Sequence, residues 1–572
     1  MKQISTLVLV CLLLHASIFS QIPNRYDIVI DELMADPTPT LALPNNEWIE
    51  LKNVSSLPFS LQGWRISDLS GQSGPMPNFI LRPDSFVIVC TASAVTAMSA
   101  YGPTISVTSF PSLDNAGNQL ALKNAQGKVI HCVAYSDKWY QNELKKEGGW
   151  SLEMIDTKNP CSGFSNWKAS MDSKGGSPGK KNSNDGTNAD KTAPQLLRAY
   201  ATDSLNVTLV FDEPVDSLGA AITTAYSISE GIGQPLTVLP VAPAFDHINL
   251  KTGNALQRNK VYKITVKSIV DCAGNLVEQA NVVKLGLASQ ADSLDLVVNE
   301  ILFNPRPSGV DYVELYNRSN KVIDLKSIYI ANRNTAGAIG SITAVSTENY
   351  LFFPGEFMVI TSDVPTVKKD FVALNPGAFA ETVSLPSFND DEGDVVILNG
   401  QGRILDELVY KENWHFKLID NREGIALERI DYQAPTLQQD NWYSAATGVG
   451  YGTPTYKNSQ FRTDLELKGD ITISPEIISP DNDGVDDFAT INYIFPAPGY
   501  VTSITIFDAT GRMVRYLQRN AISGIKGNYR WDGLGEKNQK LPVGVYVIYT
   551  AVFNLDGKKK QFKKVIVLAR RN

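Results

Sequence analysis

The sequence predicts an all-β chain made of β-sandwich domains in tandem, and three observations carry this prediction. Short runs rich in Val, Ile, Tyr and Phe recur at spacings of roughly 8–12 residues, with Gly, Pro, Asn and Asp between them. Long amphipathic helix patterns are missing, and residues 141–147 could form a single helical turn. The third observation is a duplication, because the block that begins at Ile28–Glu32 is repeated from Leu296–Glu300. Such a duplicated module is more often an architectural or binding unit than a catalytic one.

The two copies share their layout from beginning to end. Each continues with an acidic strand that ends in Asn, at Glu47–Asn53 in the first copy and Asp311–Asn317 in the second. A hydrophobic strand and a hairpin follow in both. The matched closing segments are Ser151–Glu153, Asn166–Trp167, Ser177–Pro178 and Asn182–Ser183 in the first copy, and Ala426–Glu428, Asn441–Trp442, Thr453–Pro454 and Asn458–Ser459 in the second.

Three polar linkers divide the chain of 572 residues, a length that alone suggests about three to five domains. The linkers lie at Gly175–Thr192, near Ala288–Ser293 and near Gln460–Lys468. Each segment between them is large enough to bury a core of its own. The predicted organisation is a signal peptide at 1–20, the first copy at 21–184, a second module at 193–287, the second copy at 294–460 and a C-terminal module at 470–572.

The first twenty residues have the pattern of a secretory signal peptide. Lys2 supplies the positive start, Leu7–Leu14 the apolar stretch and Ser20 a small residue before the expected cleavage. No later stretch approaches the roughly 18 apolar residues that span a bilayer, so the mature chain is expected to lack a membrane-spanning segment. The net charge of −8 argues against binding to nucleic acid or to anionic lipid.

Export would place four cysteines in an oxidising compartment, namely Cys90, Cys132, Cys161 and Cys272. Their spacing does not fit a zinc site. We expect one disulfide within the first copy, and Cys132–Cys161 and Cys90–Cys132 both remain open as the pair. Cys272 would then be an unpaired core residue.

The two copies resemble lamin tail domains, an immunoglobulin-like sandwich that also occurs in exported bacterial proteins. The resemblance rests on the opening strand, on Glu50-Leu51-x-Asn53 and Glu314-Leu315-x-Asn317, on Leu61-x-Gly63-Trp64, and on the closing segments given above. The second copy departs from the pattern at Thr455, where Gly is expected, and it retains only Leu325 of the Leu-x-Gly-Trp motif.

The other two modules also resemble immunoglobulin-like families. The second module is similar to bacterial surface-layer-type domains through Phe211-x-Glu213-Pro214-Val215 and Asp271-x-x-Gly274-Asn275. The C-terminal module resembles FlgD-type domains and type IX secretion sorting domains through Ser479–Gly484, Phe507-x-x-x-Gly511-Arg512 and Trp531-Asp532-Gly533. These resemblances imply tandem immunoglobulin-like sandwiches in a Gram-negative bacterial protein that is secreted or exposed on the outer surface. They also imply that secretion machinery is the partner of the C-terminal module.

Catalytic motifs do not emerge from the sequence, and we expect no enzymatic activity. His131, His247 and His415 form no HExxH motif. Gly71-Gln72-Ser73-Gly74 begins like a nucleophile elbow, but Pro75 follows where Gly is needed and the segment reads as a loop. Walker A and dinucleotide-binding patterns are absent as well.

Glu50 and Glu314 occupy the same position in the two copies, and we expect each to accept hydrogen bonds from an adjacent loop or strand end. Trp167 and Trp442 are also matched, and an aromatic residue at such a position usually plugs a core. If exposed, either ring could stack on a sugar, so the two tryptophans are also candidate binding residues.

The candidate metal site lies in the loop from Asp481 to Asp487. Asp481, Asp483, Asp486 and Asp487 would direct several hard oxygens to one side of a tight turn, which suits Ca²⁺. The alternative is an Asx-type turn without an ion. The acidic group at 390–394 is expected to be a solvated loop.

Together these observations predict a secreted or cell-surface, multi-domain protein with a structural or adhesive role. Its ligand would be an unidentified surface glycan or protein. A first alternative is a carbohydrate- or protein-binding accessory to exported hydrolases, and a second is a cryptic hydrolase whose carboxylates converge only in the fold.

Overall fold

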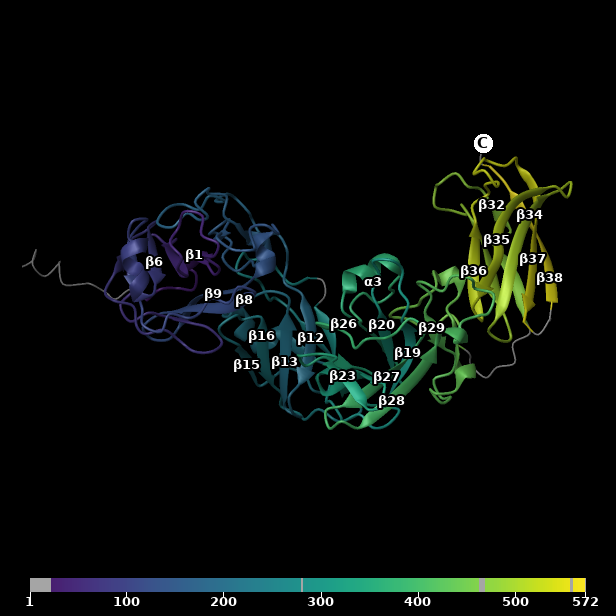
Figure 1. The fold of residues 1–572 in the computed structure, drawn as a ribbon, viewed down its shortest axis with the longest axis horizontal. Coiled ribbons are helices and arrows are strands. Elements are labelled where there is room, and N and C mark those ends of the chain that lie inside the picture. The colour runs from purple at the N-terminus through teal and green to yellow at the C-terminus, as the bar shows by residue number, and fades with distance from the viewer. Residues whose placement is uncertain (1–21, 279–280, 462–468, 556–558, 571–572) are drawn as a thin grey trace, which may run out of the picture. The chain divides into compact units, whose positions relative to one another are not determined.

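The computed structural model describes residues 22–278, 281–461, 469–555 and 559–570, and the predicted signal peptide at 1–20 lies outside this range. Nearly all regular structure is β-strand, which confirms the predicted all-β class (Figure 1). Within the described residues the α-helices are short: α2 spans Val95–Met98 and α3 spans Val364–Asp370. Residues 143–147 form turns rather than a helix. The chain divides into two compact units, one up to Leu256 with Tyr262–Leu285 and the other Gln257–Val261 with Gly286 onward.

The first copy is a sandwich of a six-stranded and a three-stranded sheet. The larger sheet has the order β11-β10-β1-β2-β6-β7 and the smaller one β4-β8-β9, and β3 and β5 form a separate two-stranded sheet. Their facing side chains, such as Ile30, Leu51, Trp64 and Leu122, form the main core. The strands are β1 Ile28–Met34, β2 Trp48–Asn53, β3 Phe59–Ser60, β4 Arg65–Ser67, β5 Ile80–Leu81, β6 Phe86–Cys90, β7 Thr104–Ser106, β8 Gly117–Lys123, β9 Val129–Ser136, β10 Leu152–Met154 and β11 Trp167–Ala169.

A β-bulge at Asp31 interrupts the pairing of β1 with β2. Ile30 pairs with Leu51 and Glu32 with Glu50, so Asp31 is the extra residue. The N–H of Ile30 donates to Nδ1 of His131 over 2.9 Å, and Nε2 of the same ring lies 3.0 Å from the Pro160 carbonyl. Burial lowers the pKa of His131 to about 4, so its ring is neutral and satisfies the backbone group that the bulge leaves unpaired.

The second module is a smaller antiparallel sandwich in the same unit. Its sheets have the orders β12-β13-β16-β15 and β14-β17-β18, and the buried side chains include Leu209, Phe211, Ile248 and Ile264. Alternation of buried and exposed residues along β16 and β17 is the pattern of strands with one face in a core. The strands are β12 Leu196–Ala201, β13 Asn206–Phe211, β14 Tyr226–Ile228, β15 Thr237–Pro240, β16 His247–Lys251, β17 Val261–Val266 and β18 Val282–Gly286.

The second copy repeats the larger sheet of the first in strand order and register, and its smaller sheet has one more strand, β23. Its sheets are β26-β25-β20-β19-β29-β30 and β23-β22-β27-β28, with the pair β21-β24. A bulge again falls between Val298 and Glu300, and here Asp406 accepts the Val298 N–H over 2.8 Å. The strands are β19 Leu296–Leu302, β20 Tyr312–Asn317, β21 Ile323–Asp324, β22 Ile328–Arg333, β23 Ile339–Ala344, β24 Leu351–Phe352, β25 Phe357–Thr361, β26 Phe379–Glu381, β27 Glu392–Asn399, β28 Ile404–Lys411, β29 Leu427–Arg429 and β30 Trp442–Ser444.

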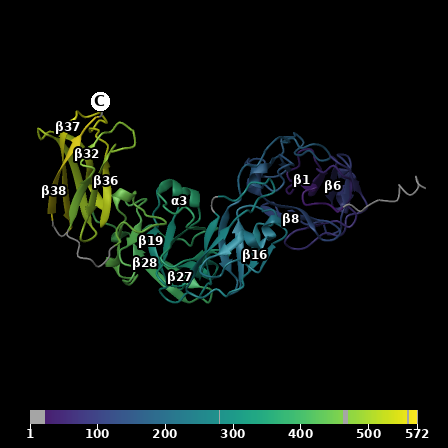
Figure 2. The same cartoon turned by 180° about the vertical axis from the view of Figure 1, so that it is seen from behind.

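The C-terminal module pairs a three-stranded sheet, β31-β33-β36, with a five-stranded sheet, β32-β38-β37-β34-β35. Figure 2 shows β32, β36, β37 and β38 of this module from behind. Trp531 and Ile548 are among its core residues. The strands are β31 Asp470–Ser474, β32 Ile477–Ile478, β33 Ala489–Ile494, β34 Tyr500–Asp508, β35 Met513–Ser523, β36 Lys526–Trp531, β37 Gly544–Asn554 and β38 Lys559–Leu568.

The disulfide differs from both pairs expected from the sequence. Cys161 bonds to Cys272, with the two Cα atoms 6.1 Å apart, so the Cys132–Cys161 and Cys90–Cys132 predictions are wrong, as is an unpaired Cys272. Cys90 is buried on β6 and Cys132 is half-buried on β9, and both are free thiols. Cys161 lies in the loop after β10, whereas Cys272 lies in a turn after β17. The bond therefore joins the first copy to the second module, which a search for partners within one copy could not reveal.

Candidate functional site: two buried carboxylate clusters

Three neighbouring strands of the first copy place three glutamates side by side in the protein interior. Glu32 on β1 lies opposite Glu50 on β2 and opposite Glu153 on β10. Directly opposed residues on one sheet face have their Cβ atoms about 5 Å apart. All three side chains have 0% exposure. We call Glu32, Glu50 and Glu153 the first carboxylate cluster.

The closing segment of the first copy, residues 177–184, supplies most of the donors for this cluster. The Ser177 N–H donates to Glu32 over 2.7 Å, and the Ser177 hydroxyl donates to Glu153 over 2.7 Å. The Gly179 N–H donates to Glu50, and both the N–H and the side-chain amide of Asn184 donate to Glu153 over 2.9 Å. The three carboxylates thus hold the closing segment against the sheet.

The second copy repeats this arrangement with different donors. Glu300 lies opposite Glu314 and Glu428, and all three, the second carboxylate cluster, have 0% exposure. Thr453 donates its N–H to Glu300 over 2.8 Å, and its hydroxyl lies 2.6 Å from Glu300 and 2.9 Å from Glu428. The Thr455 N–H donates to Glu314. The predicted role of Glu50 and Glu314 as acceptors for an adjacent loop is confirmed by these contacts.

The departure at Thr455 preserves the backbone of this contact. Gly179 has φ +79° and Thr455 has φ 74°, so both lie in the left-handed region. A Cβ on Gly179 would lie 2.1 Å from the Tyr101 carbonyl oxygen, whereas the Thr455 hydroxyl accepts the Asn375 N–H over 3.0 Å. The second copy therefore tolerates a side chain where the first copy requires glycine.

Burial shapes the charge state of both clusters. Desolvation is the main cause that raises the pKa of Glu32, Glu50, Glu300 and Glu314 above the ordinary range, and neighbouring carboxylates add to it for Glu32, Glu50 and Glu314. Burial, followed by the charge of Glu300, raises the pKa of Glu428 to about 8. Because these groups face a hydrogen-bonded segment rather than solvent, the geometry suits them to fixing a chain segment.

The two candidate binding tryptophans are buried, which removes the basis for sugar stacking. Trp167 is 1% exposed and packs at 5.8 Å from the Trp139 ring, and Trp442 is 2% exposed and donates its indole N–H to the Thr436 carbonyl over 2.8 Å. A ring without a free face offers no surface to a ligand. Both side chains plug their cores.

The acidic loop of the C-terminal module brings three of its four aspartates together. Asp481, Asp483 and Asp487 each direct a carboxylate oxygen to within 4.8 Å of the others, and Asp486 is not part of this group. The Asp481 carboxylate accepts the N–H of Asp483 over 3.1 Å, and the Asp483 carboxylate accepts the N–H of Val485 over 2.8 Å. The loop therefore has the Asx-type turns of the alternative interpretation, and calcium binding stays a prediction.

A second acidic group was not anticipated as a site from the sequence. Asp190, Glu213 and Asp271 have carboxylate oxygens within 4.8 Å of one another, beside the Cys161–Cys272 bond. Burial, followed by the charges of Asp190 and Asp271, raises the pKa of Glu213 to about 8. Glu213 and Asp271 belong to the motifs quoted above for the second module. Asp190 lies in the linker, and only the fold brings it to them.

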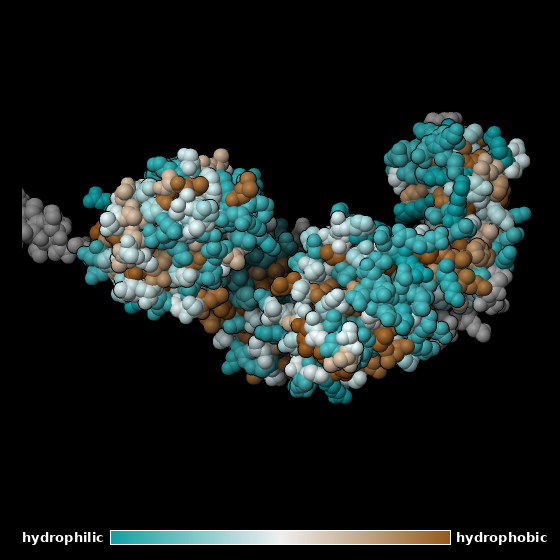
Figure 3. Space-filling view, in the orientation of Figure 1, coloured by the Kyte–Doolittle hydropathy of each residue, from teal (hydrophilic) through white to brown (hydrophobic). Residues whose placement is uncertain are grey.

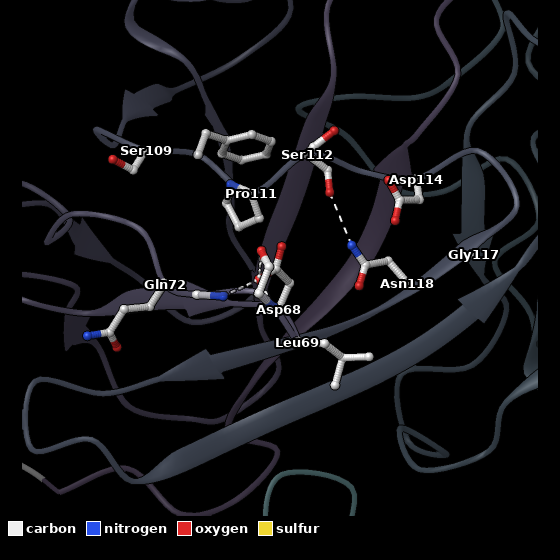
Figure 4. A pocket seen from close by; sticks show the side chains of 12 residues that line it. Asp68, Leu69, Gln72, Ser109, Pro111, Ser112, Asp114, Gly117 and Asn118 are labelled. Carbon is white, nitrogen blue, oxygen red and sulfur yellow. Dashed lines mark hydrogen bonds between the residues drawn. The ribbon is translucent and has the colours of Figure 1, made fainter. Parts of the chain in front are cut away.

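A polar pocket of about 560 Å³ opens on the first copy (Figure 4). Asp68 anchors one loop by accepting the N–H groups of Ser70 and Gly71, over 2.8 Å and 2.7 Å. On the other side, the Asn118 side chain donates to the Ser112 carbonyl over 3.1 Å. Leu69 is 81% exposed at its rim. The near-elbow sequence Gly71–Gly74 lies in the loop that lines this pocket, as irregular backbone with an isolated β-bridge at Gln72 rather than a strand-to-helix elbow.

The family comparisons identify three of the modules. Residues 21–137 and 289–412 match the model of the lamin tail domain, and residues 472–568 match that of the CHU_C type IX secretion signal domain. The chain carries two lamin tail domains and a type IX secretion signal domain. Glu153, Glu428 and both closing segments lie outside the ranges that match the lamin tail model. The type IX secretion signal domain marks the chain as an exported or cell-surface protein.

Solved structures match this chain at low similarity. The N-terminal part of the bacterial S-layer protein SbsC is 15% identical, with a TM-score of 0.16, and the match covers 38% of this chain and 44% of that chain. CopC from Methylosinus trichosporium OB3b is 18% identical, with a TM-score of 0.14 and coverage of 18% and 97%. Dimeric latent PorU from Porphyromonas gingivalis is 9% identical, with a TM-score of 0.15 and coverage of 71% and 35%. The chain thus spans less than half of the SbsC fragment. A comparison with curated proteins gives no match.

Helices long and apolar enough to cross a membrane are not found among the described residues. On the face drawn in Figure 3, hydrophilic residues cover most of the surface and hydrophobic residues occur in small groups.

Proposed function

We propose that this protein is a structural or adhesive component of the cell surface, without catalytic activity, and that secretion machinery recognises its C-terminal module. The observation that carries the proposal is the type IX secretion signal domain at 472–568, on a chain that also holds two lamin tail domains. The layout that the two carboxylate clusters share supports it, because their glutamates accept hydrogen bonds from the closing segments inside the fold.

Export can be tested in producing cells by mass spectrometry of the chain termini, on protein from washed cells and from the medium. The wild-type protein is expected outside the cytoplasm with its N-terminus at Gln21. A variant without residues 472–568 is expected to remain inside the cell envelope. Recovery of the wild type only from the cytoplasm, with Met1 retained, would contradict the proposal.

The structural or adhesive role needs a separate test. Cells that lack the protein should attach to surfaces less well, or shed envelope material more readily, than complemented cells. Unchanged attachment and envelope integrity, together with turnover of a generic ester, phosphoester or glycoside by the purified chain, would favour a hydrolase instead.

The polar pocket on the first lamin tail domain favours one alternative, a carbohydrate- or protein-binding accessory to exported hydrolases. Pockets with a few fixed polar groups and an apolar rim are the usual form of small-ligand sites. A glycan array probed with the full chain tests this alternative. Binding that is lost in Leu69→Ala, with unchanged thermal stability, would support it, because Leu69 lies at the exposed rim.

A further inference from the structure

Three buried oxygens in the first lamin tail domain face a hydrogen-bonding problem. Asp31 Oδ1, Glu50 Oε1 and Asn182 Oδ1 have no donor among the described residues, and their side chains are 1%, 0% and 7% exposed. An unsatisfied buried acceptor destabilises a fold by about 1–3 kcal/mol. Three of them in one domain therefore require an explanation.

The second lamin tail domain shows what the same place looks like when it is satisfied. Asn299 occupies its bulge, and the Asn299 side-chain amide donates to Glu314 Oε1 over 2.7 Å and to Asn458 Oδ1 over 2.6 Å. One NH₂ group thus serves two buried acceptors.

The register makes the two places equivalent. Asp31 and Asn299 are the extra residues of matched bulges, and Glu50 and Glu314 pair with matched glutamates. Asn182 donates to the Asp31 carbonyl over 2.8 Å, as Asn458 does to the Asn299 carbonyl over 2.9 Å. Glu50 Oε1 and Asn182 Oδ1 of the first domain therefore correspond to the two acceptors that the Asn299 amide serves in the second. Asp31 Oδ1 takes the place of the Asn299 NH₂ group.

An ionised Asp31 cannot donate hydrogen bonds as the Asn299 amide does, whereas a protonated Asp31 can donate one. Asp and Asn have the same shape, and the ionised acid has only acceptors, whereas the protonated acid has one donor. We propose that Asp31 holds a proton in the folded protein at neutral pH and donates a hydrogen bond through it to Glu50 or Asn182. The attachment of the closing segment 177–184 to the sheet is then pH-sensitive.

The charged surroundings agree with this assignment. Glu32 on β1, Glu50 on β2, Glu153 on β10 and Asp185 beyond the closing segment are acidic neighbours, and Lys52 on β2 is the basic one. His131 on β9 meets the bulge at Ile30 in its neutral form. Burial, opposed by Lys52 and reinforced by Glu153 and Asp185, raises the pKa of Asp31 to about 8, and Asp31 in turn raises the pKa of Glu50.

The direction of the pH effect follows from proton counts. The ordinary pKa of Asp is 3.8, so between about pH 4 and pH 8 the folded domain holds a proton at Asp31 that the unfolded chain has released. Stability then falls as pH rises across this window, and one such proton changes the unfolding constant by up to about tenfold per pH unit. Asn299 cannot contribute this term to the second domain.

The test exchanges the two residues in the full-length chain. Amide hydrogen exchange of peptides over 177–184 and 453–460 is followed by mass spectrometry from pH 5 to pH 9, after correction for intrinsic rates. Asp31→Asn is expected to reduce the loss of protection of segment 177–184 with rising pH, by up to about tenfold per pH unit. Asn299→Asp is expected to introduce that loss in segment 453–460. Unchanged pH profiles in both variants would overturn the proposal.

Infrared spectroscopy gives a second readout that does not depend on stability. At pH 7, the protonated-carboxyl absorption of the wild type is expected to lose the contribution of one carboxyl in Asp31→Asn and to gain that of one carboxyl in Asn299→Asp. Identical bands in all three proteins would overturn the proposal. So would stabilisation of segment 177–184 by added Ca²⁺ or Na⁺ in the wild type but not in Asp31→Asn, because a cation would then occupy the place given to the proton.

Discussion

The hydroxyl of Thr453 offers a sharp test of whether the second carboxylate cluster stabilises its domain. Thr453 has 0% exposure, and its hydroxyl lies 2.6 Å from Glu300 and 2.9 Å from Glu428. Thr453→Val keeps the side-chain shape and the N–H that donates to Glu300, and it removes only the hydroxyl. Hydrogen bonds contribute about 1 kcal/mol to neutral partners and about 1.5–3 kcal/mol to charged ones.

The size of the effect should depend on pH. Burial raises the pKa of Glu428 to about 8, so its carboxyl is largely neutral at pH 6 and charged at pH 9. We therefore expect Thr453→Val to lower the free energy of unfolding by about 1 kcal/mol at pH 6 and about 2 kcal/mol at pH 9. For a domain of this size each kcal/mol corresponds to about 2–4 °C in Tm.

Calorimetry of the full-length chain, with hydrogen exchange over 453–460 to assign the transition, measures this effect. Thr453→Ser is the matched control, because it retains the hydroxyl and should remain within about 1 kcal/mol of the wild type. If Thr453→Val proves as stable as Thr453→Ser at pH 9, the closing contact does not stabilise the domain and the reasoning fails.

Three other predictions follow from contacts elsewhere. Gly179→Ala should destabilise the first lamin tail domain by more than about 1 kcal/mol, since its Cβ meets a backbone oxygen. Thr455→Ala should destabilise the second domain less, and thermal unfolding measures both effects. Millimolar calcium should raise the Tm of the C-terminal module in the wild type but not in Asp483→Asn; an equal response in both would argue for the ion-free turn. Cys272→Ser should lower stability in urea by about 4–5 kcal/mol, because the bond closes 111 residues, whereas Cys132→Ser should be nearly neutral.

The duplicated sequence was sufficient to predict the fold class and part of the site. Short apolar strands at regular spacing, without long helix patterns, are typical of a β-sandwich or barrel. Glu50 and Glu314 were singled out by their repeated position, and the Gly179 and Thr455 contacts confirm the expected role. The repeated position of these glutamates therefore indicated a structural role before their contacts were known.

The rest of the site depends on strand neighbours that the sequence does not specify. Glu32 and Glu153 are far apart in the chain and meet only because β10 pairs with β1. The Cys161–Cys272 bond likewise depends on how two modules of one unit pack. Which distant segments of the chain meet is decided by the tertiary fold, and the local sequence pattern does not specify it.

The difference between Asp31 and Asn299 shows how fold and sequence must be combined. In the sequence it is one polar residue exchanged for another within two similar strands, IVIDE and LVVNE. Only the bulge places these residues among buried acceptors, where the exchange removes two donors and adds a titratable group. Because the three glutamates recur in both domains, a difference in pH response that Asp31→Asn removes from the first domain and Asn299→Asp introduces into the second traces to this position. The duplication thus supplies its own control: one copy shows the network that is complete without a proton, and the other shows where a proton is needed.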